Sequence, residues 1–340
     1  MKIDGSYGEG GGQILRYAVA LSVLKKEPLE IINIRSNRPN PGLRPQHYTA
    51  ISCLKSLCKA EVEGLFIGSP KIKFLPGEVK PGKYKFDIGT AGSITLVFQA
   101  CILSSLKTSK PIIIELTGGT DVKWSPSWDY FANIFLPLIQ KMGVKVDVQL
   151  LKRGYYPEGG GEAVLTIYPA KKLKPLQVEE KQEFSEIKGI VHIADLPDHI
   201  SKRMKHAAMK IAIKNNLQCH ITTEKTTSLS TGTGITLWSE SNSTVLGSTF
   251  LGERGITSEQ VGESAANQLL NEIQNGATID KYAIDQILPY MVIAEDKSAC
   301  VVSELSGHTK TNMWLINQFF RNQKFFKIEN KKSCKILRVK

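Results

Sequence analysis

A glycine-rich stretch near the start of the chain places a carboxylate and a guanidinium close together in sequence. Residues 4–16 read DGSYGEGGGQILR, with Glu9 among the glycines and Arg16 on the apolar segment that follows. Backbone without side chains lets a ligand approach closely, although the run matches neither GxGxxG nor GxxxxGK[ST]. Because Mg²⁺ in phosphate sites usually takes one or two carboxylates together with phosphate oxygens, Glu9 is a candidate metal ligand. The alternative is a solvated loop glutamate.

A second group of charges follows in the stretch INIRSNRPNPGLRPQH, where prolines stiffen a loop that carries Arg35, Arg38 and Arg44. Guanidinium groups held in place bind phosphates in a bidentate way at low entropic cost. Gln46 and His47 begin the next helix, where free backbone N–H groups can also meet an anion. The loop predicts a phosphate site, and ordinary surface salt bridges are the alternative.

One histidine late in the chain has neighbours typical of a reactive group. His308 lies in SELSGHTKTNMW, after a strand-like run and before a helix that we expect to start near Thr311 and Asn312. A neutral imidazole beside positive charge can act as a nucleophile towards phosphorus or as a base. The alternative is a structural histidine. The remaining histidines form no HExxH or comparable metal set.

The elements that must position these groups follow one repeated pattern of a short β-like run, a glycine-bearing turn and an apolar helix. It occurs in DGSYGEGGG before QILRYAVALSVL, in FDIGTAGS before ITLVFQACILSSL, and in IIIELTGGTDVKWSP before SWDYFANIFLPLIQKMG. Each helix is followed by a β-rich segment such as LEIINIRS, AEVEGLFIG or VKVDVQLLKRG. Alternating strands and helices predict an α/β or α+β fold of repeated β/α modules with buried helices.

The pattern is interrupted after a polar connection or exposed strand, KKLKPLQVEEKQEFSE. From residue 184 a strand, a basic helix, three further strands and a closing helix follow, and then YAIDQILPYMVIAE resumes the apolar style of the first half. Thr257 and Gln260 fit a capping box for the closing helix, and Gly276 fits its C-terminal stop. We therefore expect a discontinuous main domain, 1–183 and 277–340, with an α/β domain inserted at 184–276.

Composition narrows the classes of partner and compartment. The chain has 340 residues, and 44 Lys plus Arg against 32 Asp plus Glu leave a formal charge of +12, which favours polyanionic partners or a merely basic surface. The six cysteines show no CxxC pair, so we do not expect a structural zinc site. We expect free thiols in a reducing compartment instead. Without a visible leader or membrane-length apolar run, we expect a cytoplasmic protein with no membrane partner.

Taken together, these motifs resemble those of the RNA 3′-terminal phosphate cyclase family. The resemblance rests on GxxGEGGGQILR, IRxxRxxPGLRPQH, GTAGS, GGTDV, YYPEGGGE, YxxDQ and GHTKTN, in that order along the chain. It covers most of residues 1–168 and 277–320, whereas 184–276 match mainly in position and pattern. The resemblance implies a large domain of three repeated units, each a four-stranded sheet with two helices, and a smaller inserted α/β domain.

The resemblance also implies a three-step reaction. His308 would attack the α-phosphorus of ATP, releasing pyrophosphate and leaving a covalent enzyme-AMP. The AMP would pass to an RNA 3′-terminal phosphate, and the neighbouring 2′-hydroxyl would then expel AMP to close a 2′,3′-cyclic phosphate. A phosphomonoester is a poor electrophile, whereas the anhydride has AMP as leaving group. Charge that develops at phosphorus can be offset by arginines and a metal.

The family's site residues carry over by motif. Arg16 and Arg38 would assist His308 in catalysis and bind phosphates together with Arg35 and Gln46, and Glu9 would hold a divalent metal, Mg²⁺ or Mn²⁺. The residues expected to shape the nucleotide pocket are Gln99, Pro126, Tyr282, Asp285 and Gln286, with Pro126 and Tyr282 as adenine-stacking surfaces. Arg44 has no family role that we can assign, and core positions for Gln99 and Tyr282 are the alternative.

Two other functions stay open on the sequence. One is a catalytically silent RNA-binding homologue that acts in ribosome assembly, which the presence of His308 and Glu9 disfavours. The other is a transferase of the similarly built enolpyruvyl class, which the basic charge and the motifs disfavour. The oligomeric state is also open, a homo-oligomer included.

Overall fold

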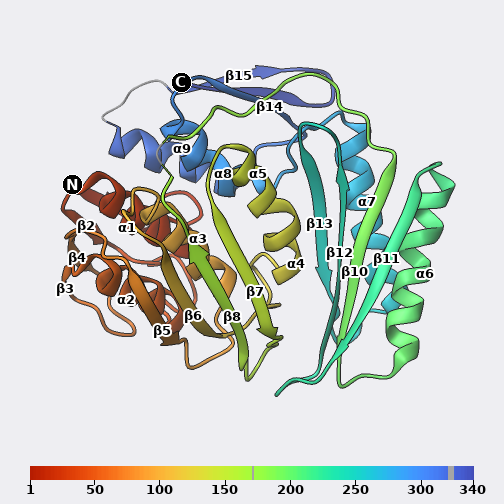
Figure 1. The fold of residues 1–340 in the computed structure, drawn as a ribbon, viewed down its shortest axis with the longest axis horizontal. Coiled ribbons are helices and arrows are strands. Elements are labelled where there is room, and N and C mark those ends of the chain that lie inside the picture. Colours follow the sequence, from red (N-terminus) through yellow and green to blue (C-terminus); the bar gives the residue numbers. More distant parts are fainter. Residues whose placement is uncertain (171, 321–324) are drawn as a thin grey trace.

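Four four-stranded sheets organise the part of the chain that the structure describes (Figure 1). The computed structural model describes residues 1–170, 172–320 and 325–340. Three of the sheets surround a shared layer of helices, and the fourth stands to one side of them (Figure 1). The fold is therefore of the mixed α/β type that the alternating sequence pattern predicts.

The first unit is built from residues 2–75. Its elements are β1 (Lys2–Asp4), α1 (Gly12–Lys25), β2 (Leu29–Ile32), α2 (Pro45–Cys58), β3 (Glu61–Glu63) and β4 (Ile72–Leu75). The strand order is β1-β2-β4-β3, with β1 and β2 parallel and the other pairs antiparallel. The expected strand in AEVEGLFIG is wrong beyond Glu63, because Gly64 adopts a φ of 76° and turns the chain.

The second unit repeats this plan over residues 82–167. Its elements are β5 (Gly82–Asp87), α3 (Ile94–Ser104), β6 (Ile112–Gly118), α4 (Trp128–Tyr130), the π-helical turn η1 (Phe131–Phe135), α5 (Leu136–Lys141), β7 (Val146–Lys152) and β8 (Gly161–Ile167). The order is β5-β6-β8-β7, again with the first pair parallel. Strand, helix, parallel strand, helix and hairpin thus recur in the same sequence.

The third unit has the same topology but is assembled from distant parts of the chain. It contains β9 (Gln177–Val178), α8 (Ala283–Ile293), β14 (Ser298–Val302), α9 (Gly307–Phe319), β15 (Phe326–Asn330) and β16 (Lys335–Val339). Its order, β9-β14-β16-β15, begins with the parallel pair β9 and β14. The predicted repetition of three units with four strands each is confirmed. The polar connection read in the sequence contains the strand β9 and ends at Glu186, which begins the strand that follows; residue 171 lies outside the described positions.

Residues between β9 and α8 form the fourth sheet. Its elements are β10 (Glu186–Ala194), α6 (Asp198–Lys214), β11 (Gln218–Thr226), β12 (Gly232–Glu240), β13 (Val245–Leu251) and α7 (Ser258–Gln274), in the strand order β11-β10-β12-β13. The capping box of Thr257 and Gln260 is present, and Gly276 has a φ of 72°. The domain limits at 184 and 276 stay a prediction.

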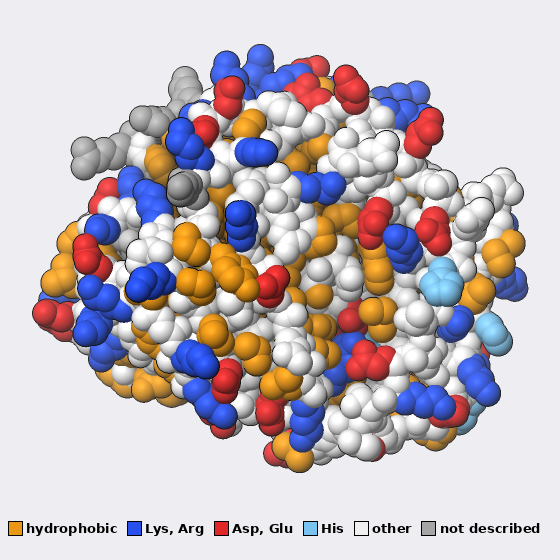
Figure 2. All heavy atoms as spheres, viewed as in Figure 1, with side chains coloured by type: hydrophobic (Ala, Val, Ile, Leu, Met, Phe, Trp, Pro, Cys, Tyr) orange, Lys and Arg blue, Asp and Glu red, His pale blue; other side chains and the backbone are white. Residues whose placement is uncertain are grey.

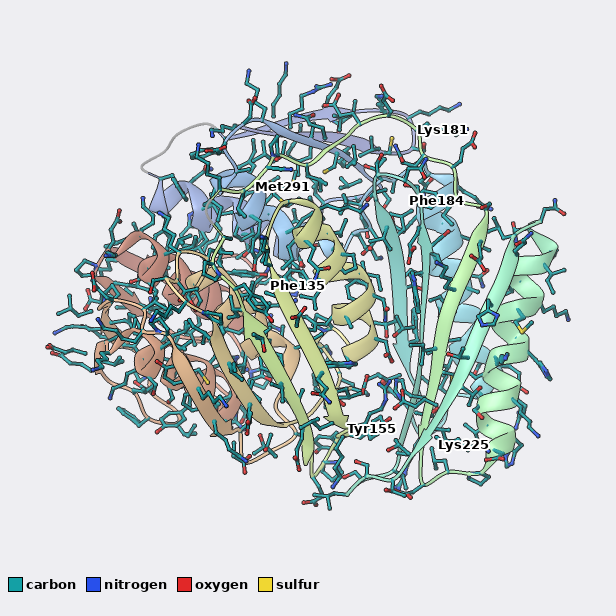
Figure 3. The ribbon with its side chains drawn as sticks, in the orientation of Figure 1. Phe135, Tyr155, Lys181, Phe184, Lys225 and Met291 are labelled. Carbon is teal, nitrogen blue, oxygen red and sulfur yellow. The ribbon has the colours of Figure 1, made fainter. Side chains whose placement is uncertain are left out.

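Two separate apolar cores stabilise these layers. The larger one includes α3, where every residue from Ile94 to Ser104 is buried, and it extends through all three repeated units. Phe135 and Met291 point into it from η1 and α8 (Figure 3). The smaller core lies under α6 and α7, whereas α4 and η1 of the second unit contact the same sheet through β12 and β13. Across the described parts of the chain, no helix combines the length and apolarity needed to cross a bilayer.

Candidate active site

The N-terminus of α9 carries the histidine that the sequence analysis selected. The expected helix start near Thr311 is wrong, because α9 already begins at Gly307 and places His308 in the first turn. The Ser306 hydroxyl accepts a hydrogen bond from the backbone N–H of Thr309 (3.0 Å), which caps the helix at that point. His308 is exposed to solvent. It therefore lies beside the free backbone N–H groups and the positive end of the helix dipole.

The glycine-rich loop packs directly onto this turn of α9. Tyr7 stacks on Trp314 with ring centroids 3.9 Å apart. The backbone N–H of Glu9 donates to the Thr311 hydroxyl (3.4 Å). A Cβ placed on Gly307 would overlap the Glu9 carboxylate, so the absence of a side chain at Gly307 lets the carboxylate lie against the helix. The first and last parts of the chain thus meet at one place.

Arg38 closes the loop around Glu9. Its Nη2 donates to the Glu9 carbonyl oxygen (2.6 Å) and lies 3.5 Å from the Glu9 carboxylate. The two side chains keep 38% and 41% of their surface exposed. Because an exposed pair of this kind contributes little to stability, both groups are free to meet a ligand.

Arg16 on α1 supplies a second positive charge. Arg16 as a whole is half-buried, and burial of its charged end lowers the pKa of Arg16 to about 10, against the opposing fields of Tyr17 and Asp285. In the parts of the chain that the structure describes, it forms no hydrogen bond or ion pair. Burial, followed by Asp280, raises the pKa of the nearby Asp285 carboxyl well above its usual range, against the field of Arg16. Arg16 thus lacks an ion-pair partner among the described residues, and an anionic ligand would stabilise its charge.

These charges act on His308. Displacement of water by the surrounding protein lowers the pKa of His308, Glu9 opposes that shift, and Arg16 and Arg38 add to it. The ring is therefore neutral at pH 7 and keeps a lone pair on one nitrogen. The predicted neighbours Glu9, Arg16, Arg38 and His308 form one cluster, which we call the cradle.

Arg35 differs from this group because its guanidinium turns back onto its own loop. Its Nη1 donates to the carbonyl oxygens of Asn40 (2.5 Å) and Gly42 (3.2 Å). Burial lowers the pKa of Arg35, and so do Arg44 and Arg38. The contacts show a loop-shaping residue whose field adds to the cradle, and they leave phosphate binding by Arg35 as a prediction.

His47 is a contributor that the sequence analysis placed only at a helix start. It is buried, its Nδ1 accepts from the backbone N–H of Arg44 (3.3 Å), and a Cβ on Gly12 would overlap its Nε2. Burial, followed by Arg16, Arg35 and Arg44, lowers the pKa of His47 well below its usual range. A neutral His47 thus joins the glycine loop to α2. The sequence carried no sign of this role, because it depends on the contact with Gly12, which only the folded chain brings close.

Gln46 connects the cradle to the second unit. Its Oε1 accepts from the backbone N–H of Ser93 (3.4 Å), the residue that caps α3. In the first turn of α3, the Thr95 hydroxyl donates to the carbonyl oxygen of Pro126 (2.8 Å). The loop that contains Pro126 is therefore fixed next to the start of α3.

The remaining predicted pocket residues lie between α3 and α8. Gln99 Nε2 donates to Gln286 Oε1 (2.5 Å), and Gln286 Nε2 donates to the Tyr282 carbonyl oxygen (2.7 Å). Both glutamines are buried, whereas Tyr282 is 43% exposed at the start of α8. Asp285 faces Arg16 from the same helix. The two glutamines hold α3 to α8 and leave the Tyr282 ring accessible.

A buried charge network that the sequence analysis did not find lies where the second unit meets the inserted strands. Arg153, at the end of β7, donates to Asp121 (3.0 Å), to both oxygens of Asp129 (2.9 and 3.1 Å) and to both oxygens of Glu224 (2.9 and 2.7 Å). The Arg153 side chain is 1% exposed. Asp121 belongs to the GGTDV motif, but no spacing rule connects it to a partner on β11, so the sequence carried no signal for the network.

His192 and Tyr155 extend this network from β10 and from the loop after β7. The Tyr155 hydroxyl and His192 Nδ1 are 2.8 Å apart, and Figure 3 shows Tyr155 at the end of β7 that faces the inserted strands. Burial lowers the pKa of His192 to about 4, against Asp121, and raises the pKa of Asp129 to about 7, against Arg153. Asp121, Asp129 and His192 could geometrically hold a cation, but Arg153 already occupies both carboxylates.

The basic excess is not gathered into one stripe on the face shown in Figure 2, where Lys and Arg side chains alternate with acidic ones. Phosphate recognition by the cradle therefore rests on local placement of charge and not on a broad basic surface.

The family model and the similar proteins that the chain matches carry the same name. The chain matches the family model described as RNA 3′-terminal phosphate cyclase over residues 7–326, which includes the inserted residues. A protein named RNA 3′-terminal phosphate cyclase from Pyrococcus furiosus is 45% identical over 318 residues, covering 94% of this chain and 92% of that protein. Proteins of the same name from Methanopyrus kandleri and Archaeoglobus fulgidus are each 43% identical, covering 94% of this chain and 93% and 95% of theirs.

Proposed function

The chain belongs to the RNA 3′-terminal phosphate cyclase family, and we propose that it is an enzyme that uses ATP to convert an RNA 3′-terminal phosphate into a 2′,3′-cyclic phosphate. The observation that carries the proposal is the cradle. An exposed, neutral imidazole in the first turn of α9 lies within the electrostatic field of Glu9, Arg16 and Arg38, which come from the opposite end of the chain.

In the first step, a ring nitrogen of His308 attacks the α-phosphorus of ATP. A nitrogen–phosphorus bond forms, the bond from the α-phosphorus to the bridging oxygen breaks, and pyrophosphate leaves with the electron pair. The lowered pKa of His308 supports this role, because only the unprotonated ring offers a lone pair. The Glu9 carboxylate, which opposes that shift, keeps the ring basic enough to remain a nucleophile.

Arg16 and Arg38 then offset charge that develops on the phosphate oxygens and on the departing pyrophosphate. Arg16 has no ion-pair partner within the described residues, and Arg38 contacts the carbonyl oxygen and the exposed carboxylate of Glu9. Positive groups already in place need no reorganisation during the reaction. The backbone N–H groups at the start of α9 add to the same field.

Two further transfers complete the reaction. An oxygen of the RNA 3′-phosphate attacks the α-phosphorus of the bound AMP, and the nitrogen–phosphorus bond breaks, which returns the electron pair to His308. The adjacent 2′-hydroxyl then attacks the RNA phosphorus, loses its proton to solvent and expels AMP. The activated anhydride makes AMP, and not oxide, the leaving group. His308 is regenerated for the next cycle.

The nucleotide base would lie between the second and third units. Apolar faces are offered by the exposed Tyr282 and by Pro126, whose carbonyl oxygen accepts the hydrogen bond from Thr95. The floor of the pocket behind them is formed by Gln99, Gln286 and Asp285. A flat base can stack on such surfaces. The assignment of each of these residues to nucleotide binding is part of the proposal.

Glu9 fits a divalent metal that is shared with phosphate. It is a single, partly exposed carboxylate that lies against Gly307 without a side chain between them. Mg²⁺ commonly takes one or two protein carboxylates and completes its shell with phosphate oxygens and water. Mg²⁺ or Mn²⁺ held by Glu9 would supply charge neutralisation at the phosphates, and the nucleophile would still come from His308.

Incubation with ATP labelled at the α-phosphate and Mg²⁺ or Mn²⁺ tests the proposal. We expect label on the protein that is stable to alkali and is released by acid or hydroxylamine, as for a phosphoramidate, and no label on His308→Ala. The matched control is His206→Ala, which removes an exposed histidine from α6 of the inserted sheet and should label like the wild type.

A second arm supplies RNA with a 3′-terminal phosphate and follows its conversion to the cyclic phosphate. Wild-type protein that binds the RNA but takes up no label would instead support the catalytically silent homologue. Equal labelling of His308→Ala and wild type would refute His308 as the nucleophile.

A further inference from the structure

Trp124 is the most exposed large apolar side chain in the described residues, with 96% of its surface accessible. It follows the GGTDV motif, in the turn between β6 and α4. Its backbone has a φ of 60°, in the left-handed region. That region is unusual for a bulky residue and is the natural place for glycine in such a turn.

Neither property of Trp124 serves the fold. An indole that buries almost none of its surface gains no hydrophobic stabilisation. A left-handed backbone at a residue with a Cβ is strained and persists only where the surroundings hold it, which is typical of binding and catalytic positions. Folding alone would favour a small residue here, so the indole needs a reason outside the folded chain.

The turn around Trp124 is held on both sides. The Ser125 hydroxyl donates to the carbonyl oxygen of Val122 (2.8 Å), and Val122 is buried. Before it, Asp121 is anchored by Arg153 in the buried network. Lys123 forms an ion pair with Glu253 of the inserted sheet (2.6 Å). The ring is therefore held out into solvent on a supported turn and is not the end of a loose loop.

The same turn leads into the proposed nucleotide pocket. Pro126, two residues after Trp124, accepts the hydrogen bond from Thr95 at the start of α3. The cap of that helix, Ser93, contacts Gln46, which adjoins His47 behind the glycine loop. A continuous series of contacts thus runs from the indole turn to the cradle.

We propose that Trp124 is a stacking platform for an unpaired base near the 3′ end of the RNA substrate. The proposal rests on the function proposed above and identifies how the polynucleotide part of the substrate is held. Bases of single-stranded RNA stack on exposed aromatic side chains without strong dependence on sequence. The adenine of ATP is a poorer occupant of this platform. Its proposed pocket has a floor of buried glutamines, whereas the Trp124 indole lies in the open with both faces exposed.

Binding of a short single-stranded RNA with a 3′-phosphate, without ATP, measures the interaction apart from catalysis. Loss of one stacked base on alanine substitution corresponds to about 5- to 150-fold in Kd. We expect Trp124→Ala to weaken RNA binding within that range and Trp124→Phe to restore most of it. Trp124→Leu, which keeps an apolar side chain without an aromatic face, should behave like Trp124→Ala.

Two further measurements separate this role from a structural one and from the proposed chemistry. Trp124→Gly should weaken RNA binding as Trp124→Ala does, yet melt at the same or a higher temperature, because glycine relieves the strained backbone. Labelling by ATP alone should be unchanged in all four variants.

RNA binding that stays within twofold of wild type in Trp124→Ala would overturn the proposal. So would parallel losses of RNA binding and ATP labelling, which would place the indole in the nucleotide pocket. Absence of labelling in the wild type would refute the proposed function alone, since RNA binding and its dependence on Trp124 are measured without ATP.

Discussion

Two regions of this molecule hold arginines in opposite surroundings. At the junction of the second unit and the inserted strands, Arg153 is fully buried and directs its donors at three carboxylates. In the cradle, Arg16 is half-buried with no partner among the described residues, and Arg38 pairs weakly with Glu9. One region has more negative than positive groups, and the other has more positive than negative groups.

The pKa directions express the same contrast in energetic terms. Burial would lower the pKa of Arg153, but Asp121, Glu224 and Asp129 raise it above the ordinary value. Burial does lower the pKa of Arg16, to about 10. A buried charge that the protein has neutralised supports the fold, whereas one left partly uncompensated favours the arrival of an anion. Charge balance therefore distinguishes a structural arginine from one available to a ligand.

The strongest test of the contrast is Arg153→Met. Removal of the guanidinium leaves Asp121 and Asp129 buried without a counter-ion, and the loss of one partner from such a network typically costs about 3–5 kcal/mol. We expect the free energy of unfolding, measured by denaturant titration, to fall by that amount.

The matched control is Arg203→Met, which breaks an exposed ion pair with Glu259 between α6 and α7. It should change the free energy of unfolding by less than about 1 kcal/mol. A loss for Arg153→Met as small as the control's would remove the distinction between the two regions.

Arg16→Ala and Arg38→Ala should give the opposite result. Each removes a positive group that the folded protein pairs weakly or not at all and that would meet phosphate charge in the complex, so we expect turnover to fall by about 10²-fold or more, as for the loss of one oxyanion donor. The melting temperature should change little, because Arg38→Ala removes only an exposed contact with Glu9 and Arg16→Ala removes no ion pair among the described residues. Equal losses of activity and stability would place these arginines in structural pairs.

The difference between the regions also explains what the sequence could predict. The cradle was predictable because its parts lie in short motifs whose composition is unusual in itself, such as glycines around Glu9 and prolines between arginines. The repeated units were predictable from the periodic succession of strand and helix. Even so, the start of α9 was misplaced, because the cap at Ser306 was hidden by the glycine that follows it.

The Arg153 network could not be predicted in this way. Its carboxylates come from the turn after β6, from α4 and from β11, and only the folded topology brings them to one point. The same is true of Gly12, whose requirement for a bare backbone comes from the ring of His47. Sequence patterns identify residues that are unusual locally, whereas pairing across units is a property of the assembled fold.

The titration of His308 sharpens the comparison at a single group. The pKa of His308 is lowered, so the acid limb of the labelling rate should lie below pH 6.5, the ordinary histidine value. Arg38→Gln removes a positive charge and should raise this pKa, whereas Glu9→Gln removes a negative charge and should lower it. NMR titration of the ring protons reads both shifts even where activity is lost. Shifts of the same sign in the two variants would refute the geometry of the cradle.

The smallest expected effect comes from Gly307→Ala, which tests whether the Glu9 carboxylate must lie against α9. The added methyl would overlap Glu9 Oε1 and displace the carboxylate, while alanine in the first turn leaves the helix as stable or up to about 1 kcal/mol more stable. We expect the metal concentration that gives half-maximal labelling to rise about 10-fold. This is the lower end of the loss in metal affinity that is typical when the support of a metal ligand is disturbed. In a Glu9→Ala background the same methyl has nothing to displace, so Gly307→Ala should cause no further change. A full effect in that background would mean that Gly307 acts on His308 or on the backbone of α9, and that Glu9 is not held by this contact.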